Sequence, residues 1–421
     1  MITPSTNTVV TFGCRLNTYE SQVIKDLVTQ AACVNTIVVN TCAVTTEAER
    51  QARQAIRKLK RQNPEAEIIV TGCAAQINPQ QFENMPEVHR ILGNDAKMVR
   101  ESYTSAEKTI INDIMAVKET AAHLVTGFDG RVRAYVQIQN GCNHRCTFCT
   151  IPYGRGNSRS VALGEIVNQI RHLLENGYQE IVLTGVDITD YGQDLPGQPN
   201  LGQMIRRLIR LLPDLKRLRL TSVDPVEIDE ELWEVIATEE RLMPHLHLSL
   251  QAGDNMILKR MKRRHLREDA IRFCERARRL RPDVVFGADL IAGFPTETDT
   301  MAENSLKIID ECDLSYLHVF PYSSRPNTPA SRMPQVPSAL IKSRAETLRQ
   351  AGQVAFQRLL QRLQGKTVDV LVESIDEGRI KGKTDHFTPI ILKSKTPLTV
   401  GDLVKASITG LTENELLGLR V

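Results

Sequence analysis

The sequence contains no run of about 18 apolar residues, the length that a membrane-spanning helix requires. Its first five residues also lack the basic and apolar regions of a signal peptide. We therefore expect no contact with a membrane and a cytoplasmic location. A large excess of either charge is absent too, since 53 Lys and Arg face 50 Asp and Glu. With a formal net charge of only +3, any site for nucleic acid must be local.

The chain contains nine cysteines. A reducing compartment disfavours disulfides, so these residues indicate metal binding or catalysis. The length of 421 residues predicts about three domains, and an apolar fraction of 41% is enough to give them cores.

Strands and helices alternate in the first part of the chain. Residues 9–12, 36–40 and 67–71 are typical of strands, and residues 19–28 and 47–62 of helices. This order favours an open parallel α/β sheet in a first domain of residues 1–125.

Each of these three strands is followed by a cysteine, namely Cys14, Cys42 and Cys73. Because the carboxyl ends of parallel strands meet at one edge of a sheet, the three thiols should form a single three-ligand site. The alternative is three small buried core residues, since cysteine packs well in protein interiors. The remaining cysteines, Cys33, Cys274 and Cys312, have no comparable placement and are interpreted as core residues.

A second group of cysteines, Cys142, Cys146 and Cys149, has the spacing Cys-x3-Cys-x2-Cys directly after a strand-like segment. Three thiolates on one loop can hold three corners of a cubane iron–sulfur cluster. With no fourth cysteine nearby, one iron is left open to a ligand that carries an amino and a carboxylate group, such as S-adenosylmethionine. A zinc site with His144 as fourth ligand is the alternative, although the histidine lies too close to its neighbours for tetrahedral geometry.

Six strand–helix units follow in residues 130–365, which predicts a partial (βα)6 barrel. The expected strands are residues 134–139, 180–184, 217–221, 245–250, 284–291 and 316–320. Ligands of such barrels bind at the carboxyl ends of the strands. Ser249, Gln251 and Asp289 lie there and are our candidates for cofactor contacts. Arg159, with Arg155, follows the cysteine loop and is a candidate for a cofactor carboxylate or an RNA phosphate. Turn residues and solvated arginines are the alternatives.

Two further segments indicate contact with nucleic acid. Residues 258–267 form a dense basic run beside the active rim, whose field would attract a polyanion. Residues 366–421 contain short strands at 366–373, 378–384, 388–393 and 403–409, which predict a small β-barrel. Related barrels bind nucleic acid on an open face. A solvated helix face and a plain packing module remain the alternative interpretations.

The Cys-x3-Cys-x2-Cys loop resembles that of the radical S-adenosylmethionine (SAM) superfamily. Residues 13–21, 39–45 and 71–76 resemble the amino-terminal domain of its methylthiotransferases, and residues 366–421 resemble their TRAM domain. The resemblance implies an α/β protein that carries two 4Fe–4S clusters. The cluster at Cys142, Cys146 and Cys149 would bind and cleave SAM, and the cluster at Cys14, Cys42 and Cys73 would hold the sulfur to be transferred. Asn17, Glu20 and Asn40 would orient the loops of the second cluster.

Residues 186–192, 258–265 and 320–323 are most similar to the bacterial branch that acts on threonylcarbamoyladenosine. This similarity implies methylthiolation of C2 of N6-threonylcarbamoyladenosine at position 37 of tRNA, with an unidentified electron donor. Isopentenyladenosine in tRNA and a ribosomal protein are the alternative substrates. A second cluster that only relays electrons, and an iron–sulfur RNA-binding protein without catalysis, also stay open. No catalytic residue is predicted beyond the cluster cysteines.

Overall fold

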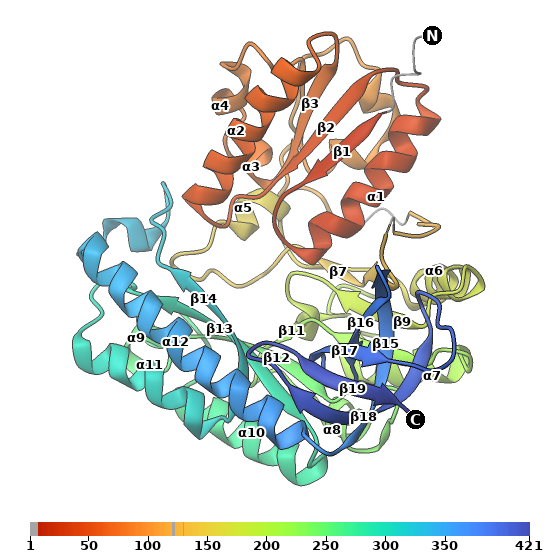
Figure 1. Cartoon of the computed structure of the whole chain (residues 1–421). Helices are drawn as coiled ribbons and strands as arrows, with labels where there is room; N and C mark the ends of the chain where they lie inside the picture. Colours follow the sequence, from red (N-terminus) through yellow and green to blue (C-terminus); the bar gives the residue numbers. More distant parts are fainter. Residues whose placement is uncertain (1–6, 120–122, 129) are drawn as a thin grey trace.

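The computed structural model describes residues 7–119, 123–128 and 130–421, which form three parts (Figure 1). The first part, at the top of the view, is a parallel sheet of five strands in the order β1-β2-β3-β4-β5. The strands are β1 (Thr8–Thr11), β2 (Thr36–Thr41), β3 (Glu67–Gly72), β4 (Arg90–Leu92) and β5 (Thr109–Ile110). The helices are α1 (Arg15–Gln30), α2 (Thr46–Gln62), α3 (Cys73–Ile77), α4 (Gln80–Glu83), η1 (Ala96–Met98) and η2 (Arg100–Tyr103).

Alternation along the central strands explains how the helices are placed. Every residue of β2 is buried, as expected for a strand covered on both faces. Val38 packs in the core that contains α1, whereas Ile37 and Val39 pack with Ile56 of α2. The two helices therefore cover opposite faces, and the predicted open α/β sheet is confirmed. Helix α1 begins four residues earlier than predicted, directly after Cys14.

The second part contains seven parallel strands in chain order, two of which are pieces of one interrupted strand. The six strand positions that result confirm the partial barrel. The sheet order is β10-β9-β6 and β11-β12-β13-β14, and only Thr221 separates β10 from β11. The strands are β6 (Arg133–Gln137), β9 (Glu180–Thr184), β10 (Arg217–Leu220), β11 (Ser222–Val223), β12 (His245–Gln251), β13 (Val285–Ala292) and β14 (Leu314–Pro321), with the short antiparallel pair β7 (Gln139–Asn140) and β8 (Arg159–Ser160) at the rim.

Helices follow these strands in turn. They are α5 (Ile151–Arg155), α6 (Leu163–Glu175), η3 (Ile188–Asp190), α7 (Leu201–Leu211), α8 (Glu230–Thr238), α9 (Asn255–Arg260), α10 (Arg267–Leu280), α11 (Asp299–Glu311) and η4 (Pro329–Arg332). A long helix that the sequence analysis did not predict, α12 (Ser338–Leu363), packs along β14 and leads to the third part (Figure 1). No helix of the described ranges is long and apolar enough to cross a membrane.

The third part is a closed barrel of five short strands, as predicted for a small β-barrel. They are β15 (Thr367–Asp376), β16 (Arg379–Thr384), β17 (Pro389–Lys393), β18 (Leu403–Leu411) and β19 (Leu416–Arg420). Strand β19 was not predicted, because Gly418 interrupts its pattern of large apolar residues. This strand closes the barrel because it pairs with both β17 and β18.

The C-terminal barrel docks against the amino-terminal halves of the large barrel's strands. Arg133, the first residue of β6, forms an ion pair with Glu373 at 2.6 Å. Arg219 of β10 donates to the carbonyl oxygen of Thr384 at 2.9 Å. The turn that follows brings Phe387, with φ of +68°, against the ring of His245. A turn of the small barrel therefore closes the floor of the large one, and the opposite rim stays available for ligands.

Candidate active site

The loop after β7 carries Cys142, Cys146 and Cys149 at the rim. Burial raises the pKa of the Cys149 thiol to about 12, and the neighbouring thiol of Cys146 adds to this shift. Burial also raises the pKa of Cys142, to which Asp187 and the other two cysteines contribute. The raised pKa values of Cys142 and Cys149 are what bound iron would reverse, since a metal cation favours the thiolate. The donor set therefore fits a cluster with three protein ligands.

Close backbone packing fixes this loop. Gly141 has φ of +73°, and a Cβ there would lie 1.9 Å from the carbonyl oxygen of Asn157. The N–H of Thr147 donates to the carbonyl oxygen of Met261 at 3.0 Å, and Arg263 donates to the sulfur of Cys146 at 3.7 Å. The basic segment after α9 thus supports the cysteine loop directly.

His144, the alternative fourth zinc ligand, is engaged elsewhere. Its Nε2 lies 2.9 Å from a carboxylate oxygen of Asp187 and 3.3 Å from one of Glu227. The hydrogen bond to Asp187, followed by that to Glu227, raises the pKa of His144 to about 10. The ring is thus turned toward the two carboxylates, which argues against the zinc interpretation. These three side chains could themselves hold a cation.

The three scattered cysteines gather at one edge of the first sheet. Cys14 precedes α1, Cys42 follows β2 and Cys73 begins α3. Burial, together with the charges of Cys73 and Cys14, raises the pKa of Cys42 to about 12, so the three thiols lie near one another. Gly13, with φ of +96°, leaves room for this group, because a Cβ there would lie 2.8 Å from the sulfur of Cys42.

A buried polar network lies behind this set. Asn17 donates to the carbonyl oxygens of Phe12 at 2.7 Å and of Thr41 at 3.0 Å, and so holds the strand ends before Cys14 and Cys42. Asn40 donates to the carbonyl oxygen of Asn17 at 3.1 Å. These contacts suit the predicted orienting role of both asparagines, which stays a prediction.

Glu20 of the same network accepts from Arg155 at 2.8 Å and from Lys97 at 2.7 Å. Burial alone would raise the pKa of Glu20, but the two cations outweigh it and lower this pKa to about 2. Arg155 also donates to Asn17 and is 1% exposed, so our interpretation of it as a contact for RNA phosphate is wrong.

The two cysteine sets meet where the first domain contacts the barrel rim. The hydroxyl of Thr150, next to Cys149, donates at 3.4 Å to the carbonyl oxygen of Ala43, next to Cys42. A Cβ on Gly154 would lie 3.2 Å from the Cβ of Cys73, because α5 packs against α3 (Figure 1). The charge of Cys73 also contributes to the raised pKa of Cys149. Both sets thus border the same interface.

The other predicted site residues lie in different surroundings. Ser249 and Gln251 are half-buried at the end of β12, and their side chains make no hydrogen bond within the described part of the chain. Arg159 donates to the carbonyl oxygens of Asn157 at 2.9 Å and of Arg155 at 3.0 Å, so its side chain stabilises the segment that follows the cysteine loop. A cofactor contact by any of these residues stays a prediction.

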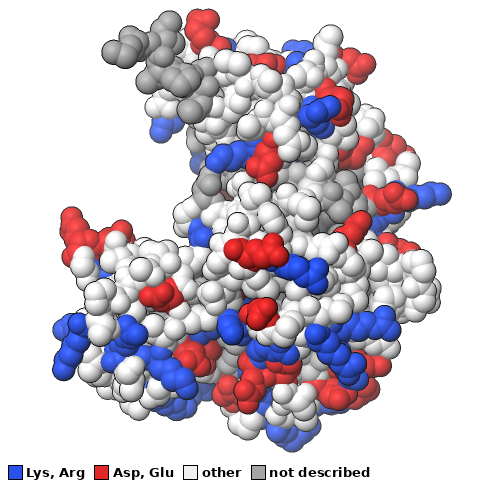
Figure 2. All heavy atoms as spheres, turned by 90° about the vertical axis from the view of Figure 1, so that its right-hand side faces the viewer, with Lys and Arg blue, Asp and Glu red and all other residues white. Residues whose placement is uncertain are grey.

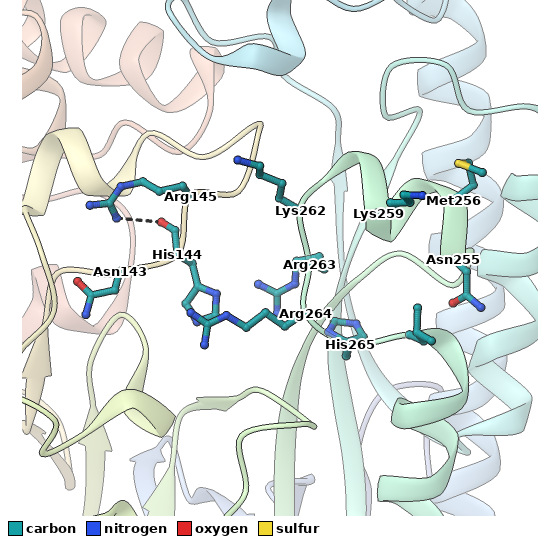
Figure 3. A pocket seen from close by; sticks show the side chains of 11 residues that line it. Asn143, His144, Arg145, Asn255, Met256, Lys259, Lys262, Arg263, Arg264 and His265 are labelled. Atoms are coloured by element: carbon teal, nitrogen blue, oxygen red, sulfur yellow. Dashed lines mark hydrogen bonds between the residues drawn. The ribbon is translucent and has the colours of Figure 1, made fainter. Parts of the chain in front are cut away.

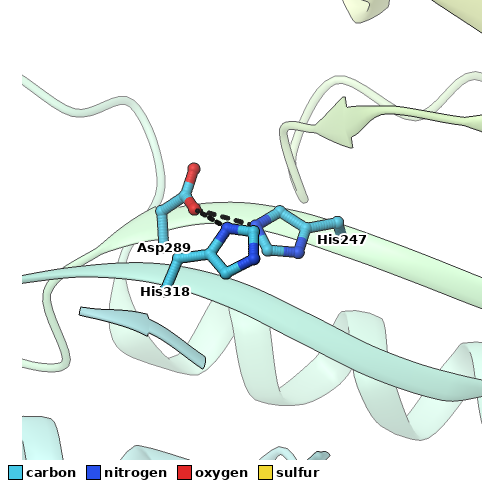
Figure 4. A group of neighbouring side chains, drawn as sticks. All are labelled: His247, Asp289 and His318. Atoms are coloured by element: carbon cyan, nitrogen blue, oxygen red, sulfur yellow. Dashed lines mark hydrogen bonds and ion pairs between the residues drawn. The ribbon is translucent and has the colours of Figure 1, made fainter. Parts of the chain in front are cut away.

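Asp289, the fourth candidate, belongs to a group that the sequence analysis missed. Its carboxylate lies 2.9 Å from Nε2 of His247 and 3.2 Å from Nδ1 of His318 (Figure 4). These imidazoles outweigh burial and lower the pKa of Asp289. The three residues come from the adjacent strands β12, β13 and β14, and could hold a metal ion or a polar substrate group. No local signal in the sequence indicates this group, because its members lie on three strands and meet only through the register of those strands.

The basic run lines a pocket of about 670 Å³ beside the cysteine loop (Figure 3). Asn143, His144 and Arg145 line one side, and the segment from Asn255 to Leu266 lines the other. Lys259 and Lys262 are exposed there, whereas Arg263 is turned inward to Asp224 and Cys146. On the face shown in Figure 2, positive and negative side chains are interspersed. The exposed lysines Lys259 and Lys262 in its lining make the pocket a local basic site, in keeping with the small net charge.

Comparisons with known proteins agree with this geometry. Residues 136–309 match the family model described as Radical SAM superfamily, and residues 6–93 match the one described as Uncharacterized protein family UPF0004. A solved structure of the radical SAM methyltransferase TsrM from Kitasatospora setae matches 78% of this chain and 77% of its own, with a TM-score of 0.55 and 14% identity, and so supports the fold.

Three curated relatives indicate which kind of radical SAM enzyme this chain resembles. The threonylcarbamoyladenosine tRNA methylthiotransferase MtaB of Rickettsia prowazekii is 53% identical over 96% of this chain and 95% of the relative. The MtaB of Aquifex aeolicus is 36% identical over 94% of this chain and 98% of the relative. A tRNA-2-methylthio-N(6)-dimethylallyladenosine synthase of Carboxydothermus hydrogenoformans is 31% identical over 95% of this chain and 96% of the relative.

The barrel with its three-cysteine rim loop defines a radical SAM enzyme, a class that uses a 4Fe–4S cluster and SAM. Within this class, the chain belongs to the family of the radical SAM tRNA methylthiotransferases.

Proposed function

We propose that this chain transfers a methylthio group to C2 of N6-threonylcarbamoyladenosine at position 37 of tRNA. The main support is the interface at which Thr150 contacts Ala43 and α5 packs on α3, because it brings two three-cysteine sets to one place. A radical is too short-lived to travel, so its source and the sulfur donor must border the same pocket. The relative with 53% identity carries this substrate in its name.

The two sets would hold two 4Fe–4S clusters. When bound, the cluster at Cys142, Cys146 and Cys149 would supply the reductive cleavage of SAM, and the cluster at Cys14, Cys42 and Cys73 would hold the sulfur to be transferred. The protein's own part is positioning: Arg263 donates to Cys146, and the buried cations Arg155 and Lys97 lie beside Cys73. Their positive charge would partly balance the negative charge of the cluster-bound thiolates of the second set.

Methylthiolation of isopentenyladenosine is the neighbouring alternative, since a relative with 31% identity is named for that product. Deleting the gene and measuring tRNA nucleosides by mass spectrometry separates the two. We expect the methylthio form of threonylcarbamoyladenosine to disappear while its unmodified precursor accumulates. Loss of the methylthio form of isopentenyladenosine instead would refute the proposal, and restoring the gene is the control.

The basic pocket would contact tRNA phosphates through Lys259 and Lys262. Both side chains are exposed and neither has a carboxylate partner within the described ranges. The double variant Lys259→Gln/Lys262→Gln should bind tRNA more weakly, with a slope of log K against log salt that is smaller by about 2. Filter binding at several salt concentrations measures this slope. Lys307→Gln, at an exposed position on α11, is the matched control and should leave the slope unchanged.

We also predict that the protein is cytoplasmic and that an unidentified electron donor reduces it. Both predictions follow from the reductive chemistry and from tRNA as the substrate.

A further inference from the structure

Arg15 connects the second cysteine set to the interior of the barrel. It follows Cys14 directly as the first residue of α1. Its guanidinium nevertheless lies over the ring of Phe387 on the barrel floor, with 5.9 Å between Cζ and the ring centroid. Tyr135 of β6 and Asp289 of β13 are near enough to influence its charge. The side chain of Arg15 therefore extends from the second cysteine set into the barrel, where Asp289 lies within electrostatic reach.

Among the described residues, no carboxylate forms a direct ion pair with the guanidinium of Arg15, and Asp289 influences it only electrostatically. Within the described part of the chain this guanidinium makes no hydrogen bond and no ion pair, and the exposure of Arg15 is only intermediate. Other cations surround the same ring, since Arg133, Arg219 and Lys383 lie 5.0, 5.1 and 4.9 Å from its centroid.

The carboxylates nearby are already used. Glu180 pairs with Arg133 and Arg219, and Asp289 accepts from two histidines. Among the described residues, Nη2 of Arg133, Nη1 of Arg219 and Nε2 of His245 are buried without any partner. These side chains are 9%, 3% and 7% exposed. The interior of the barrel thus has an excess of positive charge and unused donors, an arrangement that fits an anionic group of a ligand.

We propose that Arg15 binds the carboxylate of the threonyl group of the substrate and so selects this adenosine. The inference rests on the proposed function and adds the residue that determines its specificity. The threonylcarbamoyl group carries one carboxylate and one hydroxyl, whereas an isopentenyl group has neither. C2 and the N6-bearing carbon both flank N1 of adenine, so the substituent lies on the side of the base from which C2 is reached. A residue adjacent to Cys14 can therefore contact the substituent while the cysteine set faces C2.

The carboxylate of SAM is the competing occupant of this position. It also carries one negative charge, but it belongs to the cofactor and not to the RNA. The two are distinguished by which ligand loses affinity when the charge of Arg15 is removed. Arg15→Gln should change the kinetics for the RNA and leave the KM for SAM unchanged.

The test uses the reconstituted full-length enzyme and two anticodon stem-loop RNAs. One carries threonylcarbamoyladenosine at position 37, and the other carries its carboxamide, which has the same shape without the charge. The wild-type enzyme should prefer the carboxylate by about 10- to 100-fold in kcat/KM, the range for a hydrogen bond to a charged group. Arg15→Gln should lose this preference, and Arg15→Lys should retain part of it. Arg272→Gln, on the outer helix α10 with 66% exposure, is the matched control and should behave as wild type.

Two results would overturn the inference. One is a wild-type enzyme that modifies both RNAs equally well, a comparison that needs no variant and holds even if Arg15→Gln loses its clusters. The other is an Arg15→Gln enzyme that keeps its preference for the carboxylate or changes only the KM for SAM. A wild-type enzyme that modifies neither RNA would instead refute the proposed function itself.

Discussion

The triple variant Cys14→Ala/Cys42→Ala/Cys73→Ala is expected to release 5′-deoxyadenosine from SAM but to form no methylthiolated nucleoside. Each set has its own backbone supports, Gly13 beside Cys42 for one and Gly141 before Cys142 for the other. The cleavage of SAM therefore does not need the first domain's thiols, whereas the supply of sulfur does. Liquid chromatography with mass spectrometry quantifies both products, and iron analysis should find one four-iron cluster instead of two.

Cys142→Ala is the reciprocal change and should reduce both products to background. Cys274→Ala is the matched control, because Cys274 is fully buried on α10 and packs in the barrel core next to Cys312. It should retain both products and full iron content, with some loss of stability. A triple variant that no longer cleaves SAM although its remaining cluster is intact would show that the two sets do not act independently.

The elements that the sequence predicted well are those specified by local pattern. Strands β9 and β12 begin at the predicted residues, because a buried apolar run in β9 and an alternating pattern in β12 each follow turn signals. The meeting of Cys14, Cys42 and Cys73 could be anticipated from topology alone, since parallel strands end at a common edge. The common location of these three cysteines therefore follows from the order of the strands and not from individual side-chain contacts.

The parts that could not be predicted depend on contacts between distant segments. Arg155 bonds to Asn17, 138 residues away, and no local pattern distinguishes it from a solvated arginine. His318 joins Asp289 only because β14 lies beside β13 in a particular register. Phe387 is in a polar turn of the small barrel, where nothing in the sequence indicates that it closes the large one.

The balance of buried charges predicts that removing the charge of Glu20 destabilises the protein more than removing the charge of Arg155. Glu20, Arg155 and Lys97 are almost completely buried and together carry one net positive charge. Arg155→Met leaves Glu20 paired with Lys97, so the remaining buried charges still balance. Glu20→Gln leaves two cations facing each other with no carboxylate, and removing one partner of a buried pair is strongly destabilising.

We therefore expect Glu20→Gln to lower the free energy of unfolding by about 3–5 kcal/mol, and Arg155→Met by about 1–3 kcal/mol. Urea unfolding at neutral pH, with the clusters bound in each variant, measures both. Glu230→Gln, an exposed partner of Arg276, should leave stability unchanged. Cys73 and Cys14 also lie within electrostatic reach of Arg155, whose positive charge would partly balance the negative charge of their cluster-bound thiolates. Arg155→Met should thus remain folded but hold its second cluster poorly, and equal stability losses in the two variants would contradict this account of the buried charges.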